Sequence, residues 1–326
     1  MTTLVPVDRL EIHVLVDNAT DMLSSTPSFV EHEQAGLLRR GVRSMNGQCL
    51  CCAAHGLSCL VTAWRGEARH TVLFDSGPEN YAFERNVTRL GVDLGAVEAI
   101  VLSHGHWDHC GAMLLALTLI RARNGGREVP YYAHPDMFHS RAVKMPDGRL
   151  RQMEDVPTVD DLTGFGAQVV VTREPQAILE RMFCVSGEIP RVTAFETGLP
   201  GQVRRSADGT GWDYDELIMD ERYLAANVRG KGLVVLSACS HAGIVNVVTD
   251  ARAAFADVPL HTVMGGLHLS GTNERVIPET VEGLREFDLK CIAPGHCTGW
   301  RAVAALSAAF GDKVLAPTAV GKRYTI

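Results

Sequence analysis

The chain has 326 residues, of which 46% are hydrophobic, and it carries 31 Lys and Arg against 38 Asp and Glu, for a formal net charge of -7. This charge disfavours a nucleic-acid or membrane-surface binder, because both of those partners are anionic. The length is sufficient for a substantial core, and we expect one α/β domain over residues 1–326 rather than two smaller ones.

The sequence also carries information on location. No apolar run approaches the roughly 20 residues that a membrane span requires, and residues 1–8 lack the basic and apolar regions of a secretion signal. The nine cysteines are an odd number without regular spacing, which fits reduced thiols better than a disulfide framework. We therefore expect a cytoplasmic protein.

Strand-like and helix-like segments alternate along the chain, which predicts sheets covered by helices. In the first half we expect strands at residues 11–17, 58–64, 70–75 and 129–133 and a helix at 111–120. In the second half we expect strands at 168–172, 232–237, 260–264 and 289–293 and helices near 248–255, 278–287 and 300–310. Two similar halves suggest a sandwich. The polar segments near 147–161 and 199–220 are expected to be loop insertions.

The run Ser-His-Gly-His-Trp-Asp-His at residues 103–109 follows the apolar segment 99–102. His104 and His106 are two apart, so at a strand end they project to one side and can hold one metal ion. Asp108 and His109 follow one turn later and are placed to hold a second ion. A solvated loop is the alternative, but histidines beside a buried strand would lose water without compensation. Imidazole and carboxylate suit zinc and its neighbours.

This run matches His-x-His-x-Asp-His, and here the chain resembles the metallo-β-lactamase-fold hydrolases. The resemblance implies an α/β fold of the four-layer αββα sandwich type. It also implies one or two Zn²⁺ ions, with Mn²⁺ or Fe²⁺ as alternatives. The expected activity is hydrolysis of an ester, lactone or phosphoester by a metal-bound hydroxide.

Other expected strands also end in candidate ligands. By the resemblance, Asp75 orients a metal-bound imidazole, although a turn-forming Asp would need no metal. His241, after the strand at 232–237, is the expected third ligand of the first ion. His296, in Pro-Gly-His-Cys-Thr-Gly, resembles the late histidine that binds the second ion.

Three further side chains near these strand ends leave alternatives open. His268 follows two glycines and could touch substrate, donate a proton as a catalytic residue, ligate a metal or be purely structural. Cys239 is a soft ligand or a buried thiol, and we favour the thiol. Cys297 is expected to pack rather than react.

Two features depart from the best-known pattern of the superfamily. His134 and His139 are the only histidines between His109 and His241, so an early Gly-His-Thr-like motif is missing. The late strand also lacks the Gly-Asp that usually supplies a bridging carboxylate. The second ion is therefore less well supported than the first.

Those departures, together with motifs such as residues 239–246 and 294–299, resemble the branch named for synthesis of a dihydropterin-methyl-ribofuranosylaminobenzene phosphate. By this resemblance His55 lies near the site mouth, and Glu188 and Arg191 meet a small-molecule substrate that is phosphorylated or pterin-like. Glu188 and Arg191 could equally be surface or ion-pair residues.

The working hypothesis is a zinc-dependent hydrolase in which Asp108 also orients the nucleophile or relays its proton. A condensing synthase of the branch is the first alternative. An iron redox or sensor protein is another, although His106 favours zinc over the carboxylate of di-iron relatives. A catalytically silent ligand-binding protein is also open, as is a homo-oligomer. We expect no nucleic acid and no membrane as partners.

Overall fold

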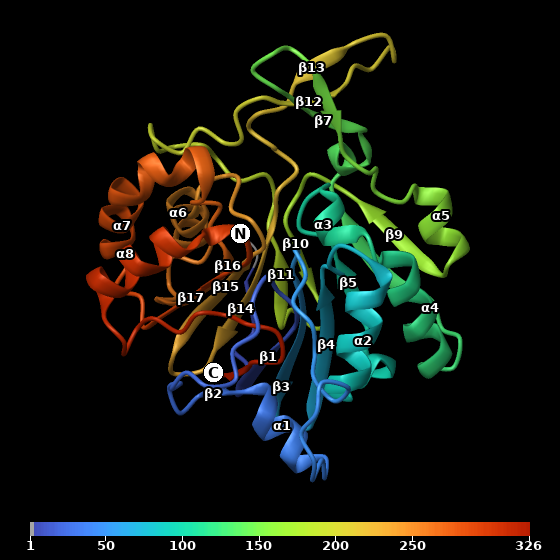
Figure 1. Cartoon of the computed structure of the whole chain (residues 1–326), viewed down its shortest axis with the longest axis vertical. Helices are drawn as coiled ribbons and strands as arrows, with labels where there is room; N and C mark the ends of the chain where they lie inside the picture. The colour runs from blue at the N-terminus through green and yellow to red at the C-terminus, as the bar shows by residue number, and fades with distance from the viewer. Residues whose placement is uncertain (1–2) are drawn as a thin grey trace.

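The computed structural model describes residues 3–326. Met1 and Thr2 lie outside the described residues. They are the first two residues of segment 1–8, which we expect to lack a secretion signal. Two β-sheets form the centre of the molecule, with helices on both outer faces (Figure 1). The first sheet contains β1 (Arg9–Val16), β2 (Val30–Glu31), β3 (Ser58–Arg65), β4 (Ala68–Phe74), β5 (Ala99–Val101), β6 (Val129–Ala133), β9 (Ala167–Val171) and β18 (Arg323–Thr325), in the order β2-β18-β1-β3-β4-β5-β6-β9.

The second sheet has six strands in the order β10-β11-β14-β15-β16-β17. They are β10 (Gln176–Ile178), β11 (Phe183–Val185), β14 (Tyr223–Val228), β15 (Gly232–Ser237), β16 (Leu260–Gly266) and β17 (Cys291–Gly295). The helices are α1 (Glu33–Arg39), α2 (Asn80–Leu90), α3 (Trp107–Cys110), α4 (Met113–Arg123), α5 (Val159–Gly164), α6 (Ile244–Ala254), α7 (Ile277–Arg285) and α8 (Trp300–Phe310).

Three apolar cores hold these layers together. The central core joins the inner faces of the two sheets and includes Val61 and Phe74 from one and Val234 and Leu236 from the other. A second core lies between the six-stranded sheet and α6, α7 and α8, and a third between the eight-stranded sheet and α2 and α4. The expected four-layer αββα sandwich is therefore confirmed.

The strands that lead to the candidate site are parallel and buried. β4, β5 and β6 are parallel neighbours in one sheet, as are β15, β16 and β17 in the other. Such strands are apolar on both faces, which is why they can be recognised as short apolar runs. Each expected strand begins and ends within two residues of the observed one.

The expectation that residues 147–161 and 199–220 are plain loops is wrong. They contain β8 (Leu150–Gln152), β12 (Gln202–Arg205), β13 (Trp212–Tyr214) and the start of α5, and with β7 (Arg141–Lys144) the strands form a third sheet in the order β13-β12-β7-β8 (Figure 1). These strands are only three or four residues long and mostly polar, so they show no alternating apolar pattern. That the chain is one domain stays a prediction.

Within residues 3–326, no helix is long and apolar enough to cross a membrane. All nine cysteines are free thiols.

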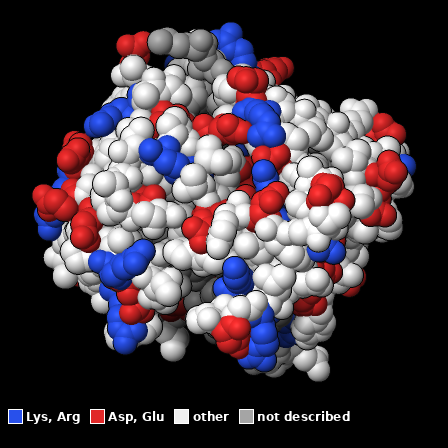
Figure 2. Space-filling view, turned by 90° about the horizontal axis from the view of Figure 1, so that it is seen from above, with Lys and Arg blue, Asp and Glu red and all other residues white. Residues whose placement is uncertain are grey.

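On the face seen from above, acidic and basic side chains are interspersed (Figure 2).

Candidate metal centre

The candidate site lies where strands of both sheets reach their carboxyl ends. Asp75 follows β4, the run from Ser103 follows β5, and His241 and His296 follow β15 and β17. Because parallel neighbours end at one edge, these segments converge although they are far apart in sequence. Asp75 and His296 have positive φ angles of 58° and 46°, which are uncommon for residues other than glycine and cluster at functional sites.

His104, His106 and His241 form a first triad. One nitrogen from each ring lies within 4.8 Å of the others, and His104 Nε2 is 3.0 Å from His106 Nδ1. All three residues are buried, with at most 5% of their surface exposed. Both ring nitrogens of His241 are buried and have no hydrogen-bond partner among the described residues.

Asp108, His109 and His296 form a second triad with the same spacing of at most 4.8 Å. Oδ2 of Asp108 is 3.4 Å from His296 Nε2 and 3.7 Å from His109 Nε2. The structure thus brings together the two sets of side chains that were expected to hold two ions.

In the first triad, two rings are held by their outward nitrogens. Ser103 Oγ donates to Asp75, so it accepts from His104 Nδ1 at 2.9 Å, which leaves His104 Nε2 facing the triad. His106 Nε2 lies 2.7 Å from the Gln202 side-chain amide, which leaves Nδ1 facing the triad. The Gln202 amide is fully buried, and its Oε1 has no hydrogen-bond partner in the part of the chain that the structure describes. The oxygen and nitrogen can therefore be exchanged, which lets Oε1 accept from His106 Nε2.

The second triad is held in the same way. His109 Nδ1 donates to Asp75 Oδ2 at 2.7 Å, and His296 Nδ1 donates to Asn18 Oδ1 at 2.9 Å. The Nε2 atom of His296 is buried and has no hydrogen-bond partner within residues 3–326. In the neutral form of both rings the outward hydrogen bond places the proton on Nδ1, so Nε2 can offer the lone pair that a cation needs.

This donor set fits a pair of transition-metal ions. Zinc accepts imidazole nitrogen at about 2.0–2.1 Å and carboxylate oxygen at about 2.0–2.2 Å, and donor atoms within 4.8 Å of one another can share a centre at those distances. Without a cation, several buried imidazole nitrogens would have no partner, which costs free energy.

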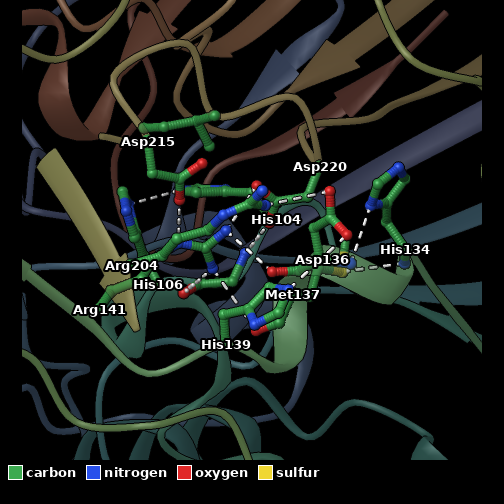
Figure 3. Close-up of polar contacts among 12 residues, drawn as sticks. His104, His106, His134, Asp136, Met137, His139, Arg141, Arg204, Asp215 and Asp220 are labelled. Carbon is green, nitrogen blue, oxygen red and sulfur yellow. Dashed lines mark hydrogen bonds and ion pairs between the residues drawn. The ribbon is translucent and has the colours of Figure 1, made fainter. Parts of the chain in front are cut away.

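Two adjacent carboxylates anchor the loops that carry the first triad. Asp220 accepts from the backbone N–H of Gly105 at 2.8 Å, and Glu221 accepts from that of His241 at 2.7 Å. The buried Arg141 donates to Asp220 Oδ1 and to the carbonyl of Gly105, at 2.8 and 2.9 Å (Figure 3). Gly105 has no room for a β-carbon, which would lie 2.1 Å from the Arg141 guanidinium.

The two triads differ in electrostatics. Burial lowers the pKa of His106 to about 3, helped by the Arg141 guanidinium, so the first triad is neutral at pH 7. Burial also lowers the pKa of His109, but the carboxylates of Asp108 and Asp75 outweigh it and raise that pKa to about 9. Burial likewise opposes ionisation of Asp108, yet the neighbouring His109 and His296 hold its pKa well below the usual range. The second triad thus combines a carboxylate with two imidazoles, whereas the first triad contains imidazoles alone.

Of the other expected site residues, some lie beside the triads and others have partners elsewhere. His55 lies at the mouth, with 59% of its side chain exposed and Nε2 3.6 Å from Asp108 Oδ2. His268 lies beside the first triad, with its ring centroid 4.4 Å from that of His241. Glu188 instead contacts His134 and Arg173.

Arg191 likewise has partners away from the triads. Its guanidinium donates to the carbonyls of Ile189, Leu217 and Ile218. The structure therefore brings neither Glu188 nor Arg191 into contact with the two triads.

Asn18 and Gln202 were not expected from the sequence. Both are single amides in polar segments, without a motif that marks them. For Asn18 the weak signal is its place directly after the first strand, whereas Gln202 reaches His106 only because β12 pairs with β7.

The chain is similar to several known proteins. A family model described as the metallo-beta-lactamase superfamily matches residues 56–201. In Methanocaldococcus jannaschii, a 7,8-dihydropterin-6-methyl-4-(beta-D-ribofuranosyl)-aminobenzene-5'-phosphate synthase is 28% identical over 249 residues, which covers 76% of this chain and 82% of that protein. An uncharacterised protein of the same organism is 28% identical over 257 residues and covers 78% and 88%.

Solved structures share the fold. Tm1679, described as a metal-dependent hydrolase of the beta-lactamase superfamily, has a TM-score of 0.70 and 21% identity over 96% of this chain and 98% of its own. Unliganded yeast PDE1 has a TM-score of 0.53 and 11% identity over 99% and 100%. At these identities the likeness is one of fold alone.

Proposed function

We propose that this chain is a metal-dependent hydrolase of an ester, lactone or phosphoester, a proposal supported by the match of residues 56–201 to the metallo-beta-lactamase superfamily model. The observation that carries the proposal is the arrangement of the imidazole nitrogens. Four rings are held from outside by Ser103, Gln202, Asp75 and Asn18, and each turns its other nitrogen toward the triads. Outer-shell hydrogen bonds of this kind orient metal-binding histidines.

His104, His106 and His241 would hold one cation, and Asp108, His109 and His296 the other. When bound, a divalent cation lowers the pKa of water from about 15.7 to about 7 and polarises a carbonyl or phosphoryl oxygen. We propose zinc, because imidazole-rich sets with one carboxylate suit it.

Two side chains at the triads have further proposed roles. Asp108 stays ionised, so its oxygens can accept a hydrogen bond from an attacking water and hold that water in line. His55 is exposed at the mouth beside Asp108, where its Nε2 can contact a substrate that enters the site. The substrate is a small molecule.

A condensing synthase is the second candidate, favoured by the named relative from Methanocaldococcus jannaschii. For that reaction the same site would bind a pterin carrying a diphosphate leaving group and a ribofuranosyl arene. The two candidates differ in product, since only the synthase forms a new bond between two substrates.

The test is to purify the protein, measure bound metal, and assay phosphodiester, lactone and thioester panels with and without a chelator. We expect hydrolysis that is lost on metal removal and regained with zinc. Activity that is indifferent to metal removal would defeat the proposal. Incubation with pterin diphosphate plus the ribofuranosyl arene, followed by product analysis, separates the synthase from the hydrolase.

A further inference from the structure

Two thiols and one imidazole lie beside the histidine triads at the ends of three neighbouring parallel strands. Cys239 follows β15, His268 follows β16 and Cys297 follows β17, and their ligand atoms lie within 4.8 Å of one another. The two sulfur atoms are 3.3 Å apart. Cys239 is 2% exposed and Cys297 is 7% exposed, whereas His268 is half-buried.

Hydrophobic packing alone does not explain this cluster. A buried cysteine can serve as a small apolar side chain, but an imidazole beside two such thiols loses part of its hydration without an apolar gain. One ring nitrogen of His268 lies within 4.8 Å of the sulfurs of Cys239 and Cys297, and its Nδ1 is buried without a hydrogen-bond partner among the described residues. His268 also has a positive φ of 44°, a conformation that costs free energy in a residue with a β-carbon.

The surrounding backbone is shaped to bring the three groups together. A β-carbon on Gly266 would lie 2.6 Å from the sulfur of Cys297 and 2.3 Å from the carbonyl of Ala238, so only glycine fits there. Thr298 accepts from the backbone N–H of Leu267 at 3.0 Å and thereby ties the end of β16 to the turn after β17.

We propose that Cys239, His268 and Cys297 form a further cation site, with two sulfur donors and one nitrogen donor, for a thiophilic ion such as Zn²⁺ or Cu⁺. Sulfur and imidazole donors select such ions over Mg²⁺ or Ca²⁺. Two Zn–S bonds of about 2.3 Å at a tetrahedral angle separate the sulfurs by about 3.8 Å, a few tenths of an ångström more than the distance observed.

This cation site adjoins the second triad. The sulfur of Cys239 is 3.3 Å from His109 Nε2, so the cysteine lies between the two groups of ligands. Each thiol gives up its proton on binding, and two thiolates balance the charge of one divalent ion. The inference goes beyond the proposed function, because it holds whichever bond the enzyme breaks.

The test loads the full chain with Co²⁺ and records its absorption spectrum and metal content. Thiolate ligation gives an intense charge-transfer band in the near ultraviolet, whereas the histidine triads contribute only weak visible bands. We expect about three ions per chain, and we expect Cys297→Ser and His268→Gln to lose the intense band and about one ion while the visible bands persist. Cys184→Ser, which changes a buried thiol of β11, is the control and leaves both readouts unchanged.

Two outcomes would overturn the inference. If the charge-transfer band is absent from the loaded wild type, the thiols bind no cation. If the band disappears only in Cys239→Ser and survives in Cys297→Ser and His268→Gln, Cys239 belongs to the histidine triads alone. Should a variant fail to fold, X-ray absorption at the zinc edge of the wild type loaded with Zn²⁺ in place of Co²⁺ gives the same decision, because it shows sulfur at about 2.3 Å or none. The visible bands report separately on the triads, so failure of the proposed function is distinguishable.

Discussion

Replacing Gln202 by Leu tests whether an outward hydrogen bond controls metal affinity. A cation on Nδ1 of His106 forces the ring proton onto Nε2, which lies 2.7 Å from the Gln202 amide. In the metal-free protein the ring can take the other tautomer, with Nδ1 donating to His104 Nε2. Leucine therefore leaves a buried N–H without an acceptor mainly in the metal-bound state.

The magnitude follows from that difference. A buried donor without a partner costs about 1–3 kcal/mol. Loss of an outer-shell partner typically weakens metal binding about 10- to 100-fold, which is about 1.4–2.7 kcal/mol. We therefore expect Gln202→Leu to bind zinc about 10- to 100-fold more weakly. Gln202→Glu should keep or exceed the wild-type affinity, since a carboxylate accepts the same hydrogen bond.

The assay is competitive titration of metal-free protein with a zinc-binding indicator, alongside thermal unfolding to show that each variant is folded. Gln168→Leu is the matched control, because Gln168 lies on β9 and its amide contacts the exposed Glu128. Equal affinity of Gln202→Leu and the wild type would refute the reasoning, as would a Glu variant as weak as the Leu variant.

Three further predictions follow from the same contacts. His241→Ala should remove at least one bound ion per chain in elemental analysis, because both ring nitrogens of His241 are buried without hydrogen-bond partners among the described residues. The control His261→Ala should not remove an ion. Equal losses in the two variants would mean that His241 is not a ligand. Asp75→Asn should weaken zinc binding about 10- to 100-fold and lower the free energy of unfolding by about 1–3 kcal/mol. The reason is that an amide has one oxygen and cannot accept from both the backbone N–H of Ser103 and Nδ1 of His109, which bond to different oxygens of Asp75. An unchanged zinc titration and urea transition would contradict this. Burial lowers the pKa of His13 to about 4, so the folded state favours the neutral ring and loses stability as the pH falls from about 6.5 toward 4. The wild type should therefore lose about 1–3 kcal/mol more than His13→Gln over that range in urea unfolding, and parallel pH profiles would exclude the effect.

The sequence predicts the buried strands and the residues that follow them, because both signals are local. An apolar run of four to six residues marks a parallel strand, and the histidines at 104, 106, 241 and 296 come two to four residues after such runs. Their convergence follows from the shared edge of parallel strands.

Apart from Asp75, which the resemblance implied, the partners that orient the histidines could not be predicted. Gln202 is separated from His106 by 96 residues and reaches it through the pairing of two short polar strands, which carry no periodic signal. Asn18 holds His296 across 278 residues. Such contacts depend on the tertiary fold, as does the placement of Glu188 and Arg191 away from the triads.

The carboxylates of Asp220 and Glu221 have a mechanical consequence. They are adjacent in the chain, yet Asp220 accepts a hydrogen bond from the loop after β5 and Glu221 accepts one from the loop after β15. A single peptide unit therefore joins the two sheets at this edge. The separation of His104 and His106 from His241 is therefore governed by a covalent spacing of about 3.8 Å between α-carbons rather than by the many contacts of the interior. Substitutions that shift the sheets by a few tenths of an ångström should therefore change the packing of the core before they change the distances between the metal-binding nitrogens. The rest of the interior can then diverge in sequence while the metal geometry stays constant.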